Sequence, residues 1–164
     1  MTSKLLLLIC ILIAFPVLMI LIALLKNDLP WGDPPGFGTR LATYLNTNIA
    51  ETTIDSVFPE LIPRRYALDK DVLKKLIVES TEKLGWDIVE PFDQHNKLHA
   101  LVATPLFGFK DDVHIKLEPG AGGTVLVSVR SASRTGKGDL GTNTRHILDL
   151  FETLDSVITL AAKQ

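Results

Sequence analysis

The sequence predicts an α+β domain, an antiparallel sheet of about five strands with two helices, preceded by one N-terminal transmembrane helix. Three observations predict it. A long run near the N-terminus carries no charge, and two later segments place apolar residues at helical spacing. Short segments of alternating apolar and polar residues also follow one another with connections of hairpin length. Such connections imply antiparallel strands, and helices on one face of the sheet complete this architecture.

The uncharged run extends from Leu5 to Leu25, 21 residues between Lys4 and Lys26. At about 1.5 Å per residue, a helix of this length crosses a hydrocarbon core roughly 30 Å thick. A cleaved secretory signal is the alternative, but its apolar region would be shorter and would end in small residues. We therefore expect residues 1–26 to be a single-pass membrane anchor.

The tail that precedes this anchor is very short, which favours an amino terminus that stays in the cytoplasm. We therefore expect a bacterial inner-membrane protein whose C-terminal domain is periplasmic. Cys10 is the single cysteine of the chain, so no disulfide forms within it.

After Lys26 the chain holds 15 basic and 19 acidic residues, a net charge of about −4. Nucleic-acid binding requires a basic face, so we expect no nucleic acid among the partners. The charge is nevertheless uneven, because between Ser128 and His146 four basic residues accompany a single acid, Asp139.

Residues 27–63 are interpreted as a juxtamembrane linker followed by a strap. The first part is rich in proline and glycine, which is typical of a stiff linker, and Trp31 suits the lipid interface. From Arg40 to Pro63 a weak helical periodicity is mixed with frequent threonine and asparagine, so we expect an irregular strap. The α+β domain then covers residues 64–164.

The domain begins with a short strand at 66–68 and a helix at 70–84. Asp69 is a suitable N-cap for this helix, and Gly85 is well placed to end it. The next segments alternate between apolar and polar residues, most clearly where Val113, Ile115 and Leu117 recur at every second position. These strands are expected at 86–92, 98–104, 113–118 and 124–133.

A final helix at 140–162 carries its apolar residues on one stripe. The resulting order, β-α-β4-α, is that of TBP-like folds, and a helix-grip-like arrangement is the alternative. A shared fold does not imply a shared function.

Residues 136–141 read GKGDLG, a literal G-x-G-x-x-G. A dinucleotide-binding fold would open with this motif and continue through βαβ units, whereas here one helix follows it and the preceding sheet is antiparallel. We therefore expect no cofactor. The glycines instead permit a tight connection between a strand and a helix, with Asp139 or Thr142 as the helix cap.

The same segment also suits an anion site. A helix N-terminus offers unpaired N–H groups, and Arg130 and Arg134 share strand parity, so both project to one face. The alternative is structural, with these arginines paired internally with Asp111, Asp112 or Asp139. The candidate ligand-binding residues are Arg130, Ser131, Ser133, Arg134, Lys137, Asp139, Asn143 and Arg145, with Asp111 and Asp112 in support.

The pattern RSASR-x-G-x-GDLG-x-N-x-R, which begins at Arg130, resembles the bacterial and plant "domain of unknown function 1499" family. The resemblance extends from about Tyr66 to Leu154 and also includes Asp111-Asp112-Val113. It implies a small α+β domain, often linked to a membrane, with no activity to carry over.

We expect neither a catalytic nor a metal site. Ser131 or Ser133 with His146 and Asp139 supplies the residue types of a hydrolase triad, but the chain has no G-x-S-x-G elbow. His95 and His99 lie on a turn leading into a strand, where a spacing of four residues does not bring metal ligands together. The adjacent carboxylates of Asp111 and Asp112 cannot act as a pair on a strand, and we expect a hairpin turn there.

These observations favour a membrane-anchored, non-enzymatic domain. It would bind an anionic small molecule, a lipid head group or a partner protein near the envelope membrane, through the segment from Ser131 to Arg145. The alternative is a scaffold or assembly subunit that docks on another membrane protein, with a purely structural loop. An uncharacterised enzyme is the third hypothesis.

Overall fold

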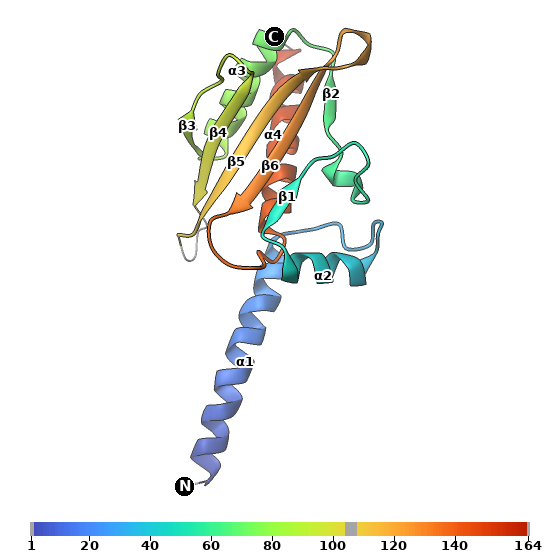
Figure 1. The fold of residues 1–164 in the computed structure, drawn as a ribbon. Helices are drawn as coiled ribbons and strands as arrows, with labels where there is room; N and C mark the ends of the chain where they lie inside the picture. Colours follow the sequence, from blue (N-terminus) through green and yellow to red (C-terminus); the bar gives the residue numbers. More distant parts are fainter. Residues whose placement is uncertain (1, 104–107, 164) are drawn as a thin grey trace.

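A computed structural model describes residues 2–103 and 108–163 of the chain. Within them the protein is an α+β fold, as predicted (Figure 1). The described α-helices are α1 (Thr2–Lys26), α2 (Phe37–Asn46), α3 (Lys70–Lys83) and α4 (Thr142–Ala161). The strands are β1 (Ile49–Glu51), β2 (Arg64–Tyr66), β3 (Asp87–Glu90), β4 (Lys97–Ala103), β5 (Lys110–Pro119) and β6 (Val125–Ser133). Two short 3₁₀ helices are η1 (Pro59–Leu61) and η2 (Ala121–Gly123). Thr104, the expected end of one strand, lies outside the described residues.

The strands form one antiparallel sheet in the order β1-β6-β5-β4-β3, and β2 pairs with the other end of β6. From β2 to α4 the order is the predicted β-α-β4-α. The sheet of the described residues has six strands, because β1 adds to the predicted five. Three residues are too few to show an alternating pattern, and β1 is stabilised by its pairing with β6. Whether the fold is TBP-like or helix-grip-like stays a prediction.

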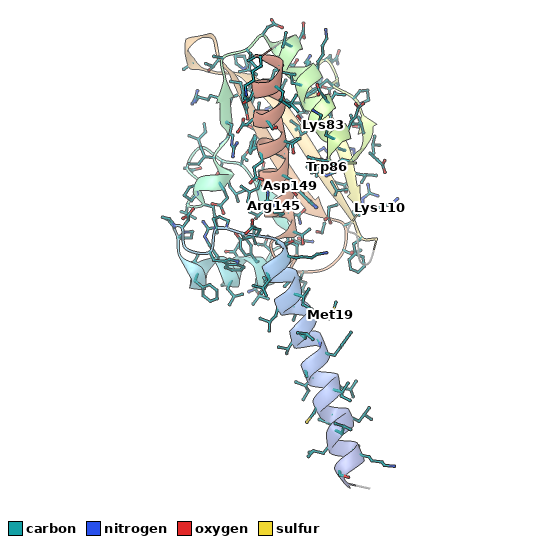
Figure 2. The ribbon with its side chains drawn as sticks, turned by 180° about the vertical axis from the view of Figure 1, so that it is seen from behind. Met19, Lys83, Trp86, Lys110, Arg145 and Asp149 are labelled. Carbon is teal, nitrogen blue, oxygen red and sulfur yellow. The ribbon has the colours of Figure 1, made fainter. Side chains whose placement is uncertain are left out.

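Helices α3 and α4 lie on one face of the sheet, and the opposite face carries no helix (Figure 1). Seen from behind in Figure 2, α4 lies in front of the sheet. Every second side chain of β4, β5 and β6 is therefore buried against these helices, and the side chains between them face solvent. The core contains Val113, Ile115 and Leu117 from β5 together with Phe151 of α4.

Helix α1 is long and apolar enough to cross a membrane between Ser3 and Lys26. Its end is attached to the domain, because the Asn27 side-chain amide donates to the carbonyl oxygen of Leu140 (2.9 Å) and to the hydroxyl of Thr142 (3.3 Å). The helix therefore leaves the domain beside the start of α4 (Figure 1).

The segment expected to be a linker and an irregular strap contains α2 and β1 and packs against the rest of the domain. Leu29, Tyr44 and Leu148 form a small apolar cluster, with Trp31 packed against it. The ring centroids of Trp31 and Tyr44 are 5.5 Å apart, in an edge-to-face arrangement. These contacts explain why α2 forms although its threonine and asparagine residues have low helix propensity. Packing against the rest of a protein stabilises a short helix more than propensity does. The division at residue 63 stays a prediction.

The strap is fixed by Arg40, whose side chain is completely buried. The Arg40 guanidinium pairs with the Glu60 carboxylate and donates to the Tyr44 hydroxyl (3.1 Å) and to the backbone oxygen of Pro34 (2.6 Å). The hydrogen bond to Glu60 is the main cause of a raised pKa for Arg40. Arg40 therefore ties together α2, η1 and the turn that precedes α2.

Replacement of Arg40 by Met is expected to lower the free energy of unfolding by about 3–5 kcal/mol, because it leaves the Glu60 carboxylate buried and unpaired. Chemical denaturation of the full chain in a non-ionic detergent measures the change. Arg65→Met, on an exposed arginine, is the matched control and should change stability by less than about 0.5 kcal/mol. Equal effects of the two substitutions would contradict a structural role for Arg40.

Candidate functional site

The predicted site residues do not form one site. Alternation along β6 sends Arg130 to the uncovered face of the sheet, whereas Ser131, at the next position, is buried under the helices. Arg134, just past the strand, reaches the same uncovered face as Arg130, as the shared parity predicted. Arg145 lies on α4, two residues after Asn143, and its side chain pairs with Asp149 and Glu152 rather than with either group.

The buried group is centred on Asn143, in the first turn of α4. Its side-chain oxygen accepts from the Ser131 hydroxyl (2.6 Å). Its amide nitrogen lies 2.6 Å from the Asp139 carboxylate, 2.9 Å from the Ser133 hydroxyl and 2.8 Å from the backbone oxygen of Asn48. One amide therefore joins β6, the loop that follows it and the strap.

Asp139 occupies the N-terminus of α4. One carboxylate oxygen accepts from the backbone N–H of Gly141 (2.8 Å) and the other from that of Asn143 (2.9 Å). The N-cap residue of α4 is Gly141, which has no side chain, so the Asp139 carboxylate supplies the capping hydrogen bonds from two residues earlier. The Thr142 hydroxyl donates to the Asp139 carbonyl (2.8 Å). A helix N-terminus attracts negative charge, and here the protein's own carboxylate fills that position. The space expected for an external anion is occupied.

The glycines of the G-x-G-x-x-G motif allow the chain to pack closely. A Cβ on Gly138 would overlap the carbonyl oxygen of Leu45 at the end of α2. Gly141 has a φ of 84°, in the left-handed region that favours glycine, and a Cβ there would overlap Leu29. The backbone N–H of Leu140 donates to the carbonyl of Tyr44 (3.0 Å). The loop therefore also supplies a hydrogen-bond donor to a carbonyl in the last turn of α2.

Asp111 and Asp112 both lie within β5, where we had expected a hairpin turn. That prediction was wrong because β5 is a central strand, paired with β4 and β6 along both edges, and these pairings extend it past its charged residues. The two side chains do point to opposite faces, as adjacent strand residues must.

Asp112 holds Arg134 on the uncovered face. Its two carboxylate oxygens each accept from the guanidinium at 2.8 Å, a bidentate pair, and one also contacts His99 Nε2 at 2.7 Å. The hydrogen bond from Arg134 is the main cause that lowers the pKa of Asp112 to about 2. Arg134 is therefore paired internally with Asp112, as the structural alternative for the loop predicted.

Arg145 is also paired within the protein. Its guanidinium contacts the Asp149 carboxylate at 2.7 Å, one turn further along α4, and that of Glu152 at 2.6 Å. The positions of Arg145 and Asp149 are labelled in Figure 2. Lys137 is exposed in the loop and forms no ion pair with the part of the chain that the structure describes.

Arg130 belongs to a shallow basic pocket on the uncovered face. Lys97 of β4 lies directly opposite Lys116 of β5, and His114 of β5 lies directly opposite Arg130 of β6. These four side chains line one pocket together with the acidic Glu51, with a volume of about 210 Å³. Partial burial is the first cause that lowers the pKa of His114, and the neighbouring His99 and Arg130 lower it further.

Only part of this positive charge is balanced. Lys116 pairs with Glu118 at 2.6 Å, whereas the contact of Arg130 with Glu51 is long, at 3.7 Å. Lys97 forms no ion pair within the described residues. Like charges directly opposite each other destabilise a sheet. Sequence reasoning missed Lys97, His114 and Lys116 because alternation gives the face of a residue but not which strands are neighbours.

Ser131 and His146 do meet, but not as a hydrolase requires. The Ser131 hydroxyl oxygen lies 3.3 Å from His146 Nδ1, and a carboxylate oxygen of Asp111, rather than Asp139, lies 3.8 Å from the same nitrogen. A triad would use the two ring nitrogens separately. Ser131 is also fully buried, so no substrate reaches it.

Asp111 and His146 are buried ionisable groups in contact. Within the described residues, neither carboxylate oxygen of Asp111 has a hydrogen-bond partner. The nearby Ser133 hydroxyl acts to lower the pKa of Asp111, but its effect is smaller than that of burial. Burial raises the pKa of Asp111 and lowers the pKa of His146 to about 4. In both groups burial therefore favours the uncharged form.

Gly138→Ala is expected to destabilise the protein by about 1–3 kcal/mol, because the new methyl group forces α2 away from the loop. Gly38→Ala is the matched control in α2, where nothing lies within 4 Å of the added atom, and it should raise stability by up to about 1 kcal/mol. Thermal denaturation of the two variants measures the difference. A Gly138→Ala protein as stable as the native chain would contradict the close packing.

The stability of the protein is expected to decrease as the pH falls from about 6.5 to about 4, the pKa values of His146 when unfolded and folded. A lowered pKa stabilises the fold above the unfolded value, and this contribution, about 3 kcal/mol, is lost as the pH approaches the folded value. His146→Phe keeps a ring beside Trp86 and should remove this part of the pH dependence. Urea denaturation at several pH values tests this, and parallel curves for the two proteins would refute it.

The family model described as "Protein of unknown function (DUF1499)" matches residues 31–154, from the cluster around Trp31 to the core residue Leu154. No match to a curated protein was found. The matched segment is more than half of the chain and includes the glycine loop, the Asn143 network and the uncovered sheet face. The chain belongs to the DUF1499 family, as its motif indicated.

Proposed function

We propose that the protein is a single-pass membrane protein whose domain binds an anionic group, a phosphate or a carboxylate, in the pocket of Lys97, His114, Lys116 and Arg130. It acts as a non-enzymatic binding module. The observation that carries the proposal is the direct pairing of Lys97 with Lys116, beside Arg130 and His114, on a sheet face without helices.

The charged residues of the predicted loop already have partners within the protein, which favours the pocket as the location of the ligand. Arg134 and Arg145 already have carboxylate partners at short distances, and Asp139 fills the helix N-terminus. A ligand at the loop would have to displace these partners. In the pocket, an anion would instead relieve the repulsion between Lys97 and Lys116, because it places a negative charge between two positive ones.

We also propose that the domain lies on the periplasmic side of a bacterial inner membrane. Lys4 precedes the span and Lys26 follows it. Arg40, the next cation, is buried and paired with Glu60, so it does not count as a free flanking charge. The domain side of the span therefore gains no further free positive charge from Arg40, and this supports a cytoplasmic amino terminus.

Titration of the full chain in non-ionic detergent with inorganic phosphate tests the binding site. We expect a bound anion to raise the low pKa of His114, which NMR of the imidazole resonances measures. In the double variant Lys97→Gln, Lys116→Gln we expect the affinity for phosphate to fall about tenfold or more, since each charge-assisted hydrogen bond contributes roughly 1.5–3 kcal/mol.

The matched control is the double variant Lys70→Gln, Lys75→Gln, which removes the same charge from exposed positions on α3. It should bind phosphate as the native chain does. Competition between phosphate and nanodiscs containing phosphatidylglycerol or phosphatidylcholine then separates a free anion from a lipid head group. A native chain in which phosphate leaves the pKa of His114 unchanged would favour a scaffold subunit with a purely structural loop.

A further inference from the structure

Helix α2 lies across the end of the domain from which α1 leaves (Figure 1). Ten residues, 27–36, separate the two helices. Leu29 from this connection packs with Tyr44 of α2, and the Asn27 side chain binds the loop before α4. These contacts fix α2 at the level where the proposed membrane span ends.

The outer surface of α2 carries no charge. Arg40 is the only charged residue between positions 34 and 49, and it is buried and paired with Glu60. Phe37 is 60% exposed and Leu45 is 43% exposed. Such a surface is unusual on a domain with fifteen basic and nineteen acidic residues after Lys26.

The helical periodicity places this surface away from the domain. Arg40 and Tyr44 are buried and therefore define the inner side of α2. At 3.6 residues per turn, Ala42 projects from the opposite side and Leu45 from the edge of that side. Phe37, three residues before Arg40, begins the helix on the Arg40 side, where it is exposed. Because the domain covers the inner side, the opposite side faces the bilayer into which α1 continues.

The backbone of α2 is also suited to an environment with little water. The carbonyl of Tyr44 accepts from the N–H of Leu140, and that of Thr47, just beyond the helix, accepts from Asp139. These groups at the helix end thus find partners within the protein, as they must where water is scarce.

We propose that α2 is an interfacial helix, which lies on the bilayer surface with Ala42 and Leu45 in contact with lipid. This inference goes beyond the anion pocket and does not depend on it, but it rests on the proposed membrane span. Lipid is favoured over a protein partner because the surface is continuous with the end of α1. An interfacial helix buries its apolar side roughly 5–10 Å into the head-group region.

The test uses the full chain in vesicles of phosphatidylcholine with a minority of phosphatidylglycerol. In a Cys10→Ser background, Leu45→Cys carries an environment-sensitive fluorophore, and Ala42→Cys is the second variant if the first does not fold. Lipid spin-labelled near its head group should quench the probe about twofold, as expected for an interfacial depth. The matched control is Leu160→Cys, which is 52% exposed in the last turn of α4. Figure 1 marks the C-terminus, just beyond α4, at the far end of the domain from α1.

The native Cys10, within α1, reports the span separately. It should be protected from a membrane-impermeant maleimide until detergent is added. If Cys10 is protected but the probes at residues 45 and 160 are quenched equally, the interfacial helix is refuted and the span stands. If Cys10 reacts freely, both the span and the interfacial helix are refuted, whereas the phosphate titration is unaffected. Shielding of residue 45 in native membranes but not in lipid vesicles would assign the surface to a protein partner and overturn the proposal.

Discussion

The buried amide of Asn143 is the interaction on which the arrangement of the domain depends. It contacts strand β6 through Ser131 and Ser133, the loop through Asp139 and the strap through Asn48. A buried polar group is costly unless its hydrogen bonds are made, so these segments have to meet at one point. The hydrogen bonds of this amide therefore fix the start of α4 relative to the sheet.

Close packing extends this constraint to the end of the domain from which α1 leaves. Gly138 lets the loop approach the end of α2, and Gly141 makes room for Leu29. The strap, α2 and the end of α1 are consequently held in one position relative to the sheet. A domain held in this way presents its uncovered sheet face and α2 at defined places relative to α1.

The distribution of charge separates structural cations from those available to a ligand. Arg40, Arg134 and Arg145 each have carboxylate partners within the protein. The opposed pair of Lys97 and Lys116 beside Arg130 is less fully compensated, at some cost to the sheet. Proteins accept such local conflicts mainly where a site requires them, which is why we propose the pocket rather than the loop as the anion site.

The sequence alone determined the local features of this protein: the uncharged run of α1, the cap of α3 by Asp69, the alternation of β5 and the apolar stripe of α4. Each depends on residues close together in the chain, whose spacing follows the period of a helix or a strand. The parity of Arg130 and Arg134 could be predicted for the same reason. Only the tertiary structure decided that α2 and β1 form, that Asp111 and Asp112 lie within a central strand, and that Lys97 faces Lys116. These features depend on which distant segments are neighbours, and pairing and packing between such segments override local propensity.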